Sequence, residues 1–384
     1  MKRIPFIAAL LLVIICNISK AQETFLDVKI YTGFRITSLT ITPIIGKYVL
    51  FENDTRIADV LKTGSVTLKA DSEKVAVIRN GETLGKFTSI AITGAGMINA
   101  IKIKPLNTTA KERTYDDDIR VSVVNGAFLI INHCELEGYV SGVVQSEGGG
   151  SAKDAEFFLV QSTTCRTYAL NNMKKHIKDG FNLCDSVHCQ LYSGRCKSVE
   201  ILAATYKTAG DVIVDKDKNM ISAAFHSNSG GQTINSEDLW KIPTSYLRSV
   251  QDTFSLAMPG AYWEKRKPVT EWLDYLQHKY NYPVNDSVMK RKALNFQQPV
   301  RMVYFEDSIP LANIRADLGL RSTFFSISKQ GSEIVFKGRG YGHGVGLSQQ
   351  GAMRMSQLGY TYRDIIRFYY KDVDIVPYES LQGK

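Results

Sequence analysis

The sequence predicts an α+β fold, in which mixed, β-rich sheets and a few helices surround a cleft, preceded by a small β-rich N-terminal unit. Short apolar runs separated by turn residues follow one another between residues 24 and 107, a pattern typical of strands. Asn125-Gly126 joins two further runs, because this pair tolerates the positive φ angles of a tight hairpin turn. Two runs with helical spacing come next, which makes the fold mixed.

The composition excludes several classes of protein. Hydrophobic residues at 44% and charged residues at 22% are ordinary globular values, so the chain is not disordered. A single long apolar run is too little for a polytopic membrane protein. A length of 384 residues exceeds what one hydrophobic core usually organises, so we expect a large domain with a smaller one, or two unequal domains.

The chain begins with a pattern typical of a secretory signal peptide, which we assign to residues 1–21. Two basic residues precede an apolar run that is too short to span a bilayer, and small residues allow cleavage after Ala21. A lipoprotein anchor at Cys16 is the alternative, but Ile15 stands where that processing needs a small residue. We expect an exported protein, in the periplasm, the cell envelope or outside the cell, with no transmembrane anchor in the mature chain.

The mature chain is basic. Loss of the signal removes three basic residues and no acidic ones, which lowers the formal net charge from +9 to +6. A basic exported chain attracts polyanionic surfaces. Nucleic acid is not expected outside the cytosol, whereas an acidic cell-envelope polymer fits both the charge and the location.

The strand pattern divides the chain at about residue 110. Residues 22–110 form the predicted N-terminal unit, and residues 111–384 form the second domain. Residues 111–118 are polar and mark either a boundary or a solvated loop. The expected strands are 25–30, 39–41, 48–51, 66–70, 75–78, 91–92 and 100–103, and then the hairpin 119–124 and 127–131.

Two helices are predicted in the second domain, at residues 136–144 and 155–175, where apolar residues recur at helical spacing. Gly148-Gly149-Gly150 lies between them and permits unusual backbone angles. Residues 257–296 look like an insertion rich in aromatic and basic residues, including Lys290-Arg291-Lys292. We expect a surface helix or lobe there, with a contact to a glycan or polyanion as the alternative.

Two cysteines and two histidines occur within fourteen residues: His176, Cys184, His188 and Cys189. Thiolate and imidazole ligands suit tetrahedral Zn²⁺, and four protein ligands leave no open position, so the metal would be structural. A Cys184–Cys189 disulfide, or free thiols, are the alternatives. The other mature cysteines, Cys134, Cys165 and Cys196, are odd in number, so their disulfide state stays open.

Two polar, glycine-rich segments are candidate site walls. One holds His226, Ser227, Ser229, Gly230 and Gly231, and the other holds His343, Ser348 and Gln349. Neither matches a phosphate-binding loop. A serine triad that uses a serine of the first segment and one of these histidines is an alternative, although no G-x-S-x-G motif occurs. Cys165 as a thiol nucleophile is another, but it falls in an apolar helical pattern typical of a buried cysteine.

Several motifs together carry a resemblance to the sporulation stage II protein D (SpoIID/LytB) family. The resemblance extends over about residues 115–375 and does not cover residues 22–110, whose role stays open. The motifs, which match in order and spacing, are residues 139–147, Gln161 with residues 166–170, residues 225–231, 237–240 and 246–250, and the loop 340–352.

The resemblance implies a peptidoglycan lytic transglycosylase with Glu147 as its one catalytic acid. Such an enzyme cleaves glycan strands between N-acetylmuramic acid (MurNAc) and N-acetylglucosamine (GlcNAc) and leaves 1,6-anhydro ends. Glu147 must then be protonated near neutral pH, which partial burial away from cations favours. The expected substrate-binding residues of the glycan-binding cleft are Arg166, Tyr168, His226, Ser227, Ser229, Gly230, Gly231, His343, Ser348 and Gln349.

The resemblance also favours structural zinc at His176, Cys184, His188 and Cys189, since some family members have such a site, and it implies no cofactor for catalysis. It permits another function as well, that of a non-catalytic peptidoglycan-binding activator of a cell-wall amidase. One departure bears on this choice: Gly148-Gly149-Gly150 replaces the Met-Pro type of turn that commonly follows the glutamate. Whether the substrate must first lose its stem peptides stays open.

Overall fold

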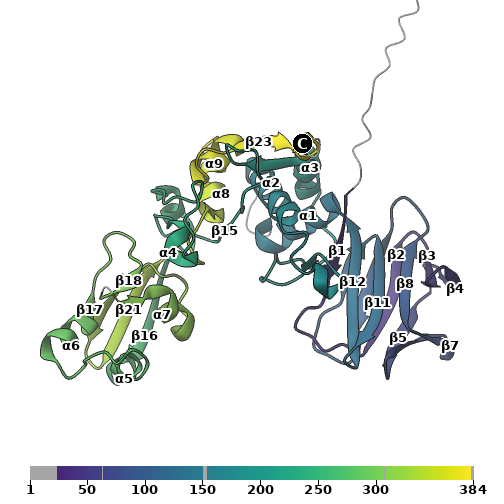
Figure 1. Ribbon diagram of the computed structural model, residues 1–384, viewed down its shortest axis with the longest axis horizontal. Helices are drawn as coiled ribbons and strands as arrows, with labels where there is room; N and C mark the ends of the chain where they lie inside the picture. The colour runs from purple at the N-terminus through teal and green to yellow at the C-terminus, as the bar shows by residue number, and fades with distance from the viewer. Residues whose placement is uncertain (1–23, 63, 150–153, 307, 382–384) are drawn as a thin grey trace, which may run out of the picture.

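A computed structural model describes residues 24–62, 64–149, 154–306 and 308–381. Three parts follow one another along the molecule: a β-rich part, a central group of helices, and a lobe with its own small sheet (Figure 1). The predicted α+β class is confirmed. The predicted signal, residues 1–21, lies outside the described residues, and within them no helix is both long and apolar enough to cross a bilayer.

The β-rich part contains two sheets. The larger has the strand order β13-β1-β12-β11-β8-β3-β4, and the second has the order β10-β9-β2-β5-β6-β7. Their strands are β1 (Phe25–Lys29), β2 (Ser38–Ile45), β3 (Tyr48–Glu52), β4 (Thr55–Val60), β5 (Val66–Asp71), β6 (Lys74–Arg79), β7 (Glu82–Phe87), β8 (Ser89–Gly94), β9 (Ala100–Pro105), β10 (Arg113–Asp116), β11 (Asp118–Val124), β12 (Ala127–Glu135) and β13 (Leu183–Cys184).

The division expected at residue 110 does not separate two cores. β1 pairs with β12, and β8 pairs with β11, so strands from both sides of residue 110 lie in one sheet. Alternate residues of β2 and β11 are buried, which is the pattern of strands with one face on a core. The inward residues of both sheets join a single hydrophobic core that continues into the helices.

The central part contains both predicted helices. The first is confirmed at its predicted bounds. The second ends four residues early, at Asn171, because Asn172 leaves the helical backbone angles, with φ of −112° and ψ of 12°. The elements are α1 (Leu136–Val144), a π-helical turn (Gln145–Gly149), α2 (Ala155–Asn171), α3 (Val199–Lys207), β14 (Asp211–Val214), β15 (Phe225–His226), α4 (Ser236–Trp240), β22 (Leu347–Ser348), α8 (Gln349–Gln357), α9 (Tyr362–Tyr369) and β23 (Asp374–Pro377).

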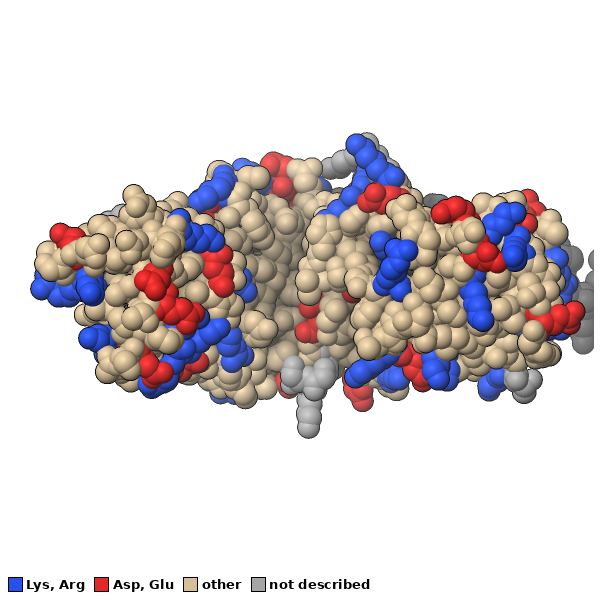
Figure 2. Space-filling model, turned by 90° about the horizontal axis from the view of Figure 1, so that it is seen from below, with Lys and Arg blue, Asp and Glu red and all other residues tan. Residues whose placement is uncertain are grey.

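The lobe has a hydrophobic core of its own, centred on the fully buried Trp272. It is larger than the predicted insertion, residues 257–296, because β16 completes its sheet only by pairing with β21. Lys and Arg side chains gather at its outer end (Figure 2). Its elements are β16 (Tyr262–Pro268), α5 (Val269–Tyr280), α6 (Ser287–Leu294), β17 (Asn295–Phe296), β18 (Tyr304–Phe305), β19 (Ile309–Pro310), α7 (Leu311–Leu318), β20 (Phe325–Gln330) and β21 (Glu333–Arg339).

A separate core predicts separate melting of the lobe. Trp272→Ala leaves a large cavity and removes the indole N–H bond to the carbonyl of Ala293, so it should cost the lobe about 3–5 kcal/mol. Scanning calorimetry should then show one early transition while the main transition stays in place. Tyr262→Ala is the control, since that side chain is 62% exposed, and it should change neither transition. If Trp272→Ala shifted all transitions equally, the lobe would not unfold independently of the rest of the protein.

Candidate active site and metal centre

Glu147 lies in the π-helical turn that joins α1 to the segment before α2. Its side chain is half-buried, and one carboxylate oxygen accepts a hydrogen bond from the backbone N–H of Leu191 at 2.7 Å. Burial raises the pKa of this carboxyl, and the Leu191 bond only partly opposes that shift. No cation contributes to the shift, so the carboxyl meets the electrostatic requirement expected of a general acid.

One segment, residues 191–198, holds the whole turn. The Gln145 side-chain oxygen accepts from the backbone N–H of Lys197 at 2.7 Å, and the Ser146 hydroxyl accepts from that of Ser193 at 2.9 Å. With the Leu191 bond to Glu147, three consecutive side chains are fixed by backbone donors of this segment. We call residues 191–198 the clamp segment.

Close packing brings the clamp segment onto α1. A Cβ atom on Gly142 would lie 2.4 Å from the Gly194 carbonyl oxygen, a distance that real side chains do not reach. Glycine at this helix position therefore lets the clamp segment approach α1. The position of Glu147 depends on this approach.

Gln349, the first residue of α8, lies beside the turn. Its side-chain nitrogen is 3.4 Å from the place that a Cβ on Gly148 would take. This nitrogen is buried and finds no hydrogen-bond partner among the described residues. A buried donor without a partner is costly, so a polar group bound near Glu147 is the expected acceptor.

The serines predicted to bind substrate differ in how deeply they are buried. Ser229 and Ser348 are fully buried: the Ser229 hydroxyl donates to Asp252 at 2.7 Å, and the Ser348 hydroxyl caps α8 by accepting from Gly351. They tie the 225–231 segment to α8 and do not face solvent. Ser227 is half-buried, and its backbone carbonyl accepts from Gln350. Of the three serines, Ser227 is the one that is not fully buried.

The two predicted histidines face each other, with ring centroids 5.4 Å apart. Both ring nitrogens of His343 are bound by backbone, since Nε2–H donates to Phe225 and Nδ1 accepts from Val345. Burial lowers the pKa of His343 to about 4, and it lowers the pKa of His226 as well. His226 donates through Nδ1 to Val345, which leaves Nε2 as a buried acceptor without a partner among the described residues.

Neighbouring glycines allow this arrangement. Gly230 and Gly231 have positive φ angles of 69° and 100°, and a Cβ on Gly230 would lie 2.6 Å from the backbone of Arg339. They shape the turn and offer no side chain to a ligand. Their role is thus to bring the 225–231 segment against the end of β21.

The prediction that Arg166 binds substrate needs correction. Arg166 is fully buried and makes a bidentate ion pair with Glu137, at 2.8 and 2.5 Å. It also donates to the carbonyls of Thr205 and Asp211, so its donors serve the contact of α2 with α1 and α3. The helical spacing that placed Arg166 on α2 could not reveal which side of the helix faces solvent.

Tyr168 lies near the metal ligands instead of the Glu147 turn. Its hydroxyl accepts from Lys175 at 3.3 Å, and Lys175 also donates to the carbonyl of His188 at 2.5 Å. Tyr168 and Lys175 therefore brace the chain between α2 and the metal ligands.

Sequence reasoning missed Trp240 as a site residue. Its ring is 42% exposed at the end of α4 and lies 5.8 Å from the His343 ring. The sequence did contain a reason to choose Trp240, because this residue ends one of the motifs that resemble the family and tryptophan is scarce in this chain. An exposed indole next to a polar site wall can stack on a sugar ring.

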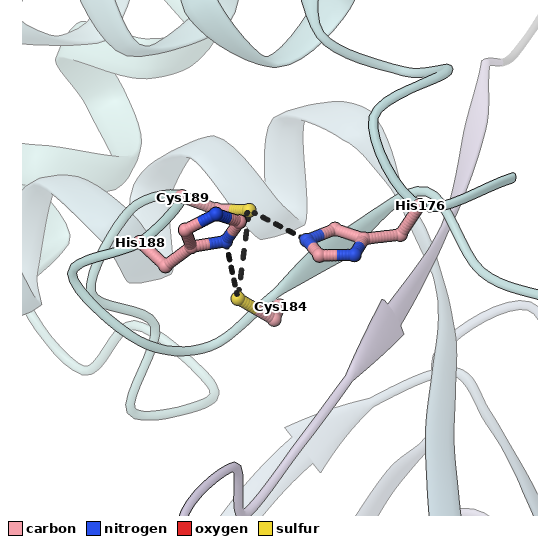
Figure 3. A group of neighbouring side chains, drawn as sticks. All are labelled: His176, Cys184, His188 and Cys189. Atoms are coloured by element: carbon pink, nitrogen blue, oxygen red, sulfur yellow. Dashed lines mark hydrogen bonds between the residues drawn. The ribbon is translucent and has the colours of Figure 1, made fainter. Parts of the chain in front are cut away.

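The four predicted metal ligands converge (Figure 3). The Sγ atoms of Cys184 and Cys189 are 3.5 Å apart, His188 Nδ1 lies 3.9 and 3.8 Å from them, and His176 Nε2 lies 3.5 Å from Cys189 Sγ. These separations match the edges of a tetrahedron around an ion with Zn–S bonds of about 2.3 Å and Zn–N bonds of about 2.0 Å. Both cysteines are free thiols, and 3.5 Å is far longer than a disulfide of about 2.05 Å.

A carboxylate supports one of these ligands. His176 points Nε2 at the thiols, while its Nδ1 lies 3.1 Å from Asp179. This histidine–carboxylate pairing is the usual second contact of a metal-bound imidazole. The residue types, the separations and this contact all fit zinc.

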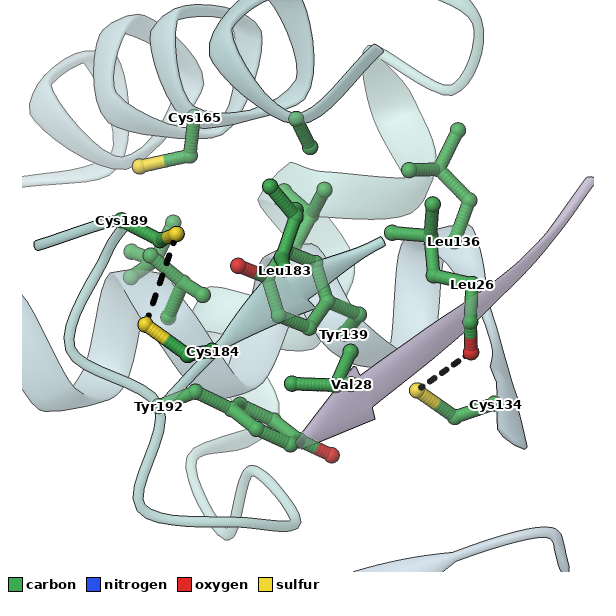
Figure 4. Packing of buried hydrophobic residues seen from close by; sticks show 14 of the residues in the cluster. Leu26, Val28, Cys134, Leu136, Tyr139, Cys165, Leu183, Cys184, Cys189 and Tyr192 are labelled. Atoms are coloured by element: carbon green, nitrogen blue, oxygen red, sulfur yellow. Dashed lines mark hydrogen bonds between the residues drawn. The ribbon is translucent and has the colours of Figure 1, made fainter. Parts of the chain in front are cut away.

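The remaining cysteines are not members of the candidate metal group, and Figure 4 shows two of them, Cys134 and Cys165, in the packed core. Cys134, Cys165 and Cys196 are buried free thiols. Burial raises the pKa of the Cys165 thiol far above its ordinary range, so the thiolate needed of a nucleophile does not form there. Cys165 is a core residue, as its helical pattern indicated.

Comparison with known proteins finds similarity over the part of the chain that holds the candidate site. The family model described as Stage II sporulation protein matches residues 124–214, which include α1, Glu147 and the metal ligands. Stage II sporulation protein D of Bacillus subtilis is 27% identical over 74% of this chain and 87% of its own length. The protein of that name from Bacillus amyloliquefaciens is 29% identical over 66% of this chain and 78% of its own.

A third relative carries a different name. The amidase enhancer of Bacillus subtilis is 24% identical over 62% of this chain, a match that spans 40% of the relative. Together the matches support a protein with a role related to the cell wall. Residues 124–214 thus resemble the SpoIID family model, and about two thirds or more of the chain is similar to proteins named Stage II sporulation protein D.

The Arg166–Glu137 pair predicts a structural defect and not a binding defect. Arg166→Met leaves a buried unpaired carboxylate and should destabilise the fold by about 3–5 kcal/mol in denaturant titrations, with unchanged affinity of the folded fraction for glycan. Arg166→Met with Glu137→Met should recover much of that loss, because both charges are removed. Lys174→Met, an exposed neighbour, should change stability by less than about 0.5 kcal/mol. Weaker glycan binding by folded Arg166→Met would restore the substrate-binding role.

Proposed function

We propose that this protein is an exported peptidoglycan lytic transglycosylase that cleaves strands between MurNAc and GlcNAc. The observation that carries the proposal is a half-buried glutamic acid whose pKa is raised by burial and is not shifted by any second carboxylate. Glycoside hydrolases need such a partner to activate water or to act as nucleophile. A lone acid suits a reaction in which the substrate supplies its own nucleophile.

The reaction needs only one protein carboxyl. Protonated Glu147 gives its proton to the glycosidic oxygen as the bond from that oxygen to the MurNAc C1 breaks. The MurNAc C6 hydroxyl then bonds to C1 and returns its proton to the Glu147 carboxylate, which regenerates the acid. The products are a 1,6-anhydro-MurNAc end and a free GlcNAc hydroxyl, and no water is consumed.

The Glu147 turn, the 225–231 segment and α4 offer groups for contacts to sugar. The Gln349 amide nitrogen is a donor beside the turn, Ser227 offers a hydroxyl, and the exposed Trp240 ring offers a stacking face. His226 Nε2 is an acceptor for a hydroxyl proton. These groups come from three separate segments that converge at α8 and β15.

Zinc is proposed as a structural ion held by His176, Cys184, His188 and Cys189. Four protein ligands leave no position for substrate, so the ion would take no part in the reaction. Cys189 stands two residues before Leu191, where the clamp segment begins. The bound ion would therefore fix one end of the segment that orients Glu147.

A second function has support of its own, that of a peptidoglycan-binding activator of a cell-wall amidase. One relative is named an amidase enhancer. Glycines 148 and 149 follow Glu147 within the turn, in place of the more rigid pattern expected of the family. In this case the protein would bind the polymer and an amidase without cutting the glycan.

Glu147→Gln separates the two functions. Wild-type mature protein should release anhydro-MurNAc ends from peptidoglycan, measured by mass spectrometry, and Glu147→Gln should release at least 100-fold less, the loss typical of a missing general acid. Intact and amidase-stripped substrate are compared in parallel to show whether stem peptides must be absent. Products from Glu147→Gln at the wild-type rate would refute the mechanism. Retained binding without products from either protein would favour the activator.

The raised pKa of Glu147 gives a pH signature. The acid form is the active one, so kcat should fall as pH rises through this pKa, above the ordinary value of 4.5. The favourable contribution of this group to folding is complete below pH 4.5 and is lost as pH rises through the same pKa. Glu147→Gln should consequently be more stable than wild type at pH 7, and the gap should close in acid. If Glu147→Gln were less stable than wild type at pH 7, the inference that burial raises the pKa of the Glu147 carboxyl would be wrong.

The zinc proposal is tested by metal content, independently of activity. Wild type and Cys134→Ser should purify with one zinc per chain, and Cys184→Ser should lose it. Asp179→Ala, which removes the contact behind His176, should lower zinc affinity by about 10- to 100-fold in a chelator competition. If Cys184→Ser retained zinc at wild-type affinity, the proposed zinc site would be wrong.

A further inference from the structure

The basic charge of the mature chain is concentrated in the lobe. Residues 262–339 contain 13 Lys and Arg against 8 Asp and Glu, a net charge of +5. The remaining mature residues contain 31 against 30, a net charge of +1. The attraction to polyanions inferred from the whole chain therefore belongs to the lobe.

Some lobe cations are already neutralised by neighbouring carboxylates. Lys267 pairs with Glu271, Lys279 with Asp317 and Lys292 with Glu306. Lys290, Arg291 and Lys329 are exposed and have no carboxylate partner among the described residues. A ligand can engage these three without first breaking an ion pair, and the same holds for the exposed Arg321 and Lys337, which do not line the pocket described below.

The same three cations line one pocket, of about 490 Å³, between α6 and β20. Ser287, Leu294, Asn295 and Ser328 complete its lining, and no acidic residue contributes. α6 lies at the outer end of the lobe in Figure 1, where Figure 2 shows Lys and Arg side chains gathered. The two residues on α6 and the one on β20 hold their charges around a common space.

We propose that this pocket binds carboxylate groups of peptidoglycan and so anchors the polymer away from Glu147. The inference rests on the proposed function for the choice of polymer. Each muramic residue of peptidoglycan has either a free lactyl carboxylate or, where that carboxyl forms an amide with a stem peptide, the carboxylates of the peptide, so the polymer presents regularly repeated anions. Two ammonium groups and one guanidinium group without partners complement such a strand, and the amide and hydroxyl groups of the pocket can bond to its polar atoms.

The lobe and the Glu147 turn then have separate tasks. The lobe packs its own core and contributes no residue to the clamp segment. Removal of its pocket charges should weaken attachment to the polymer and leave the chemistry at Glu147 intact. Attachment should weaken with added salt, because exposed charges are screened over about 10 Å at 0.1 M ionic strength.

The test measures binding to purified sacculi in a Glu147→Gln background, so that no cutting occurs. The variant Lys290→Gln, Arg291→Gln, Lys329→Gln should bind about tenfold more weakly than its parent at low salt, and the difference should vanish at 1 M salt. The matched control is Lys47→Gln, Lys69→Gln, Lys104→Gln, which removes three exposed cations without carboxylate partners from the β-rich part. It should keep at least half of the parental affinity.

If the two triple variants lost affinity for sacculi equally, the loss would depend on net charge alone, and the proposal that the pocket binds the polymer would be wrong. Sacculi treated with hydrofluoric acid, which removes phosphate polymers and leaves carboxylates, should bind as untreated sacculi do. Loss of the charge-dependent binding after that treatment would overturn the assignment to peptidoglycan carboxylates. If the active parent makes no anhydro ends while the pocket variant still loses affinity, the proposed function fails and the anchoring site stands.

Discussion

Three hydrogen bonds between the π-helical turn and the clamp segment determine where Glu147 lies. Gln145, Ser146 and Glu147 each accept from a backbone N–H of residues 191–198. A turn bounded by glycines has little stiffness of its own. Its conformation therefore depends on a segment more than forty residues later in the chain. The contact of Gly142 with Gly194 sets the distance over which these bonds form.

The clamp segment is in turn fixed from both ends. Before it, Leu183 and Cys184 form β13, which pairs with β1, and the candidate metal ligands His188 and Cys189 follow a few residues later. After it, Ser198 caps α3 by accepting from Ile201. The buried Arg166–Glu137 pair then holds α2, α1 and the end of α3 together. A raised pKa at Glu147 is maintained because this framework keeps water and cations away from one side of the carboxyl.

The sequence was sufficient to predict local features and insufficient for features set by distant packing. The α+β class, both helices of the central part and the grouping of four metal-ligand side chains could be predicted from periodicity and spacing. The shared sheet of β1 and β12 could not, since strand pairing across 100 residues leaves no local pattern. Arg166 and Ser229 have side chains suited to sugar binding, but burial turns both inward. Trp240 was overlooked because the exposure of a ring depends on tertiary packing.

The pairing of β1 has a consequence for the order of folding. β1 is the first strand of the described chain, yet its neighbours are β12 and β13, whose residues come more than 100 positions later. During synthesis from the N-terminus, both edges of β1 stay unpaired until β12 has been made, and one edge stays unpaired until residue 184 has been made. Closing such long loops is slow. The β-rich part, although first in sequence, is thus completed late, and it is completed by the same stretch that carries the candidate metal ligands.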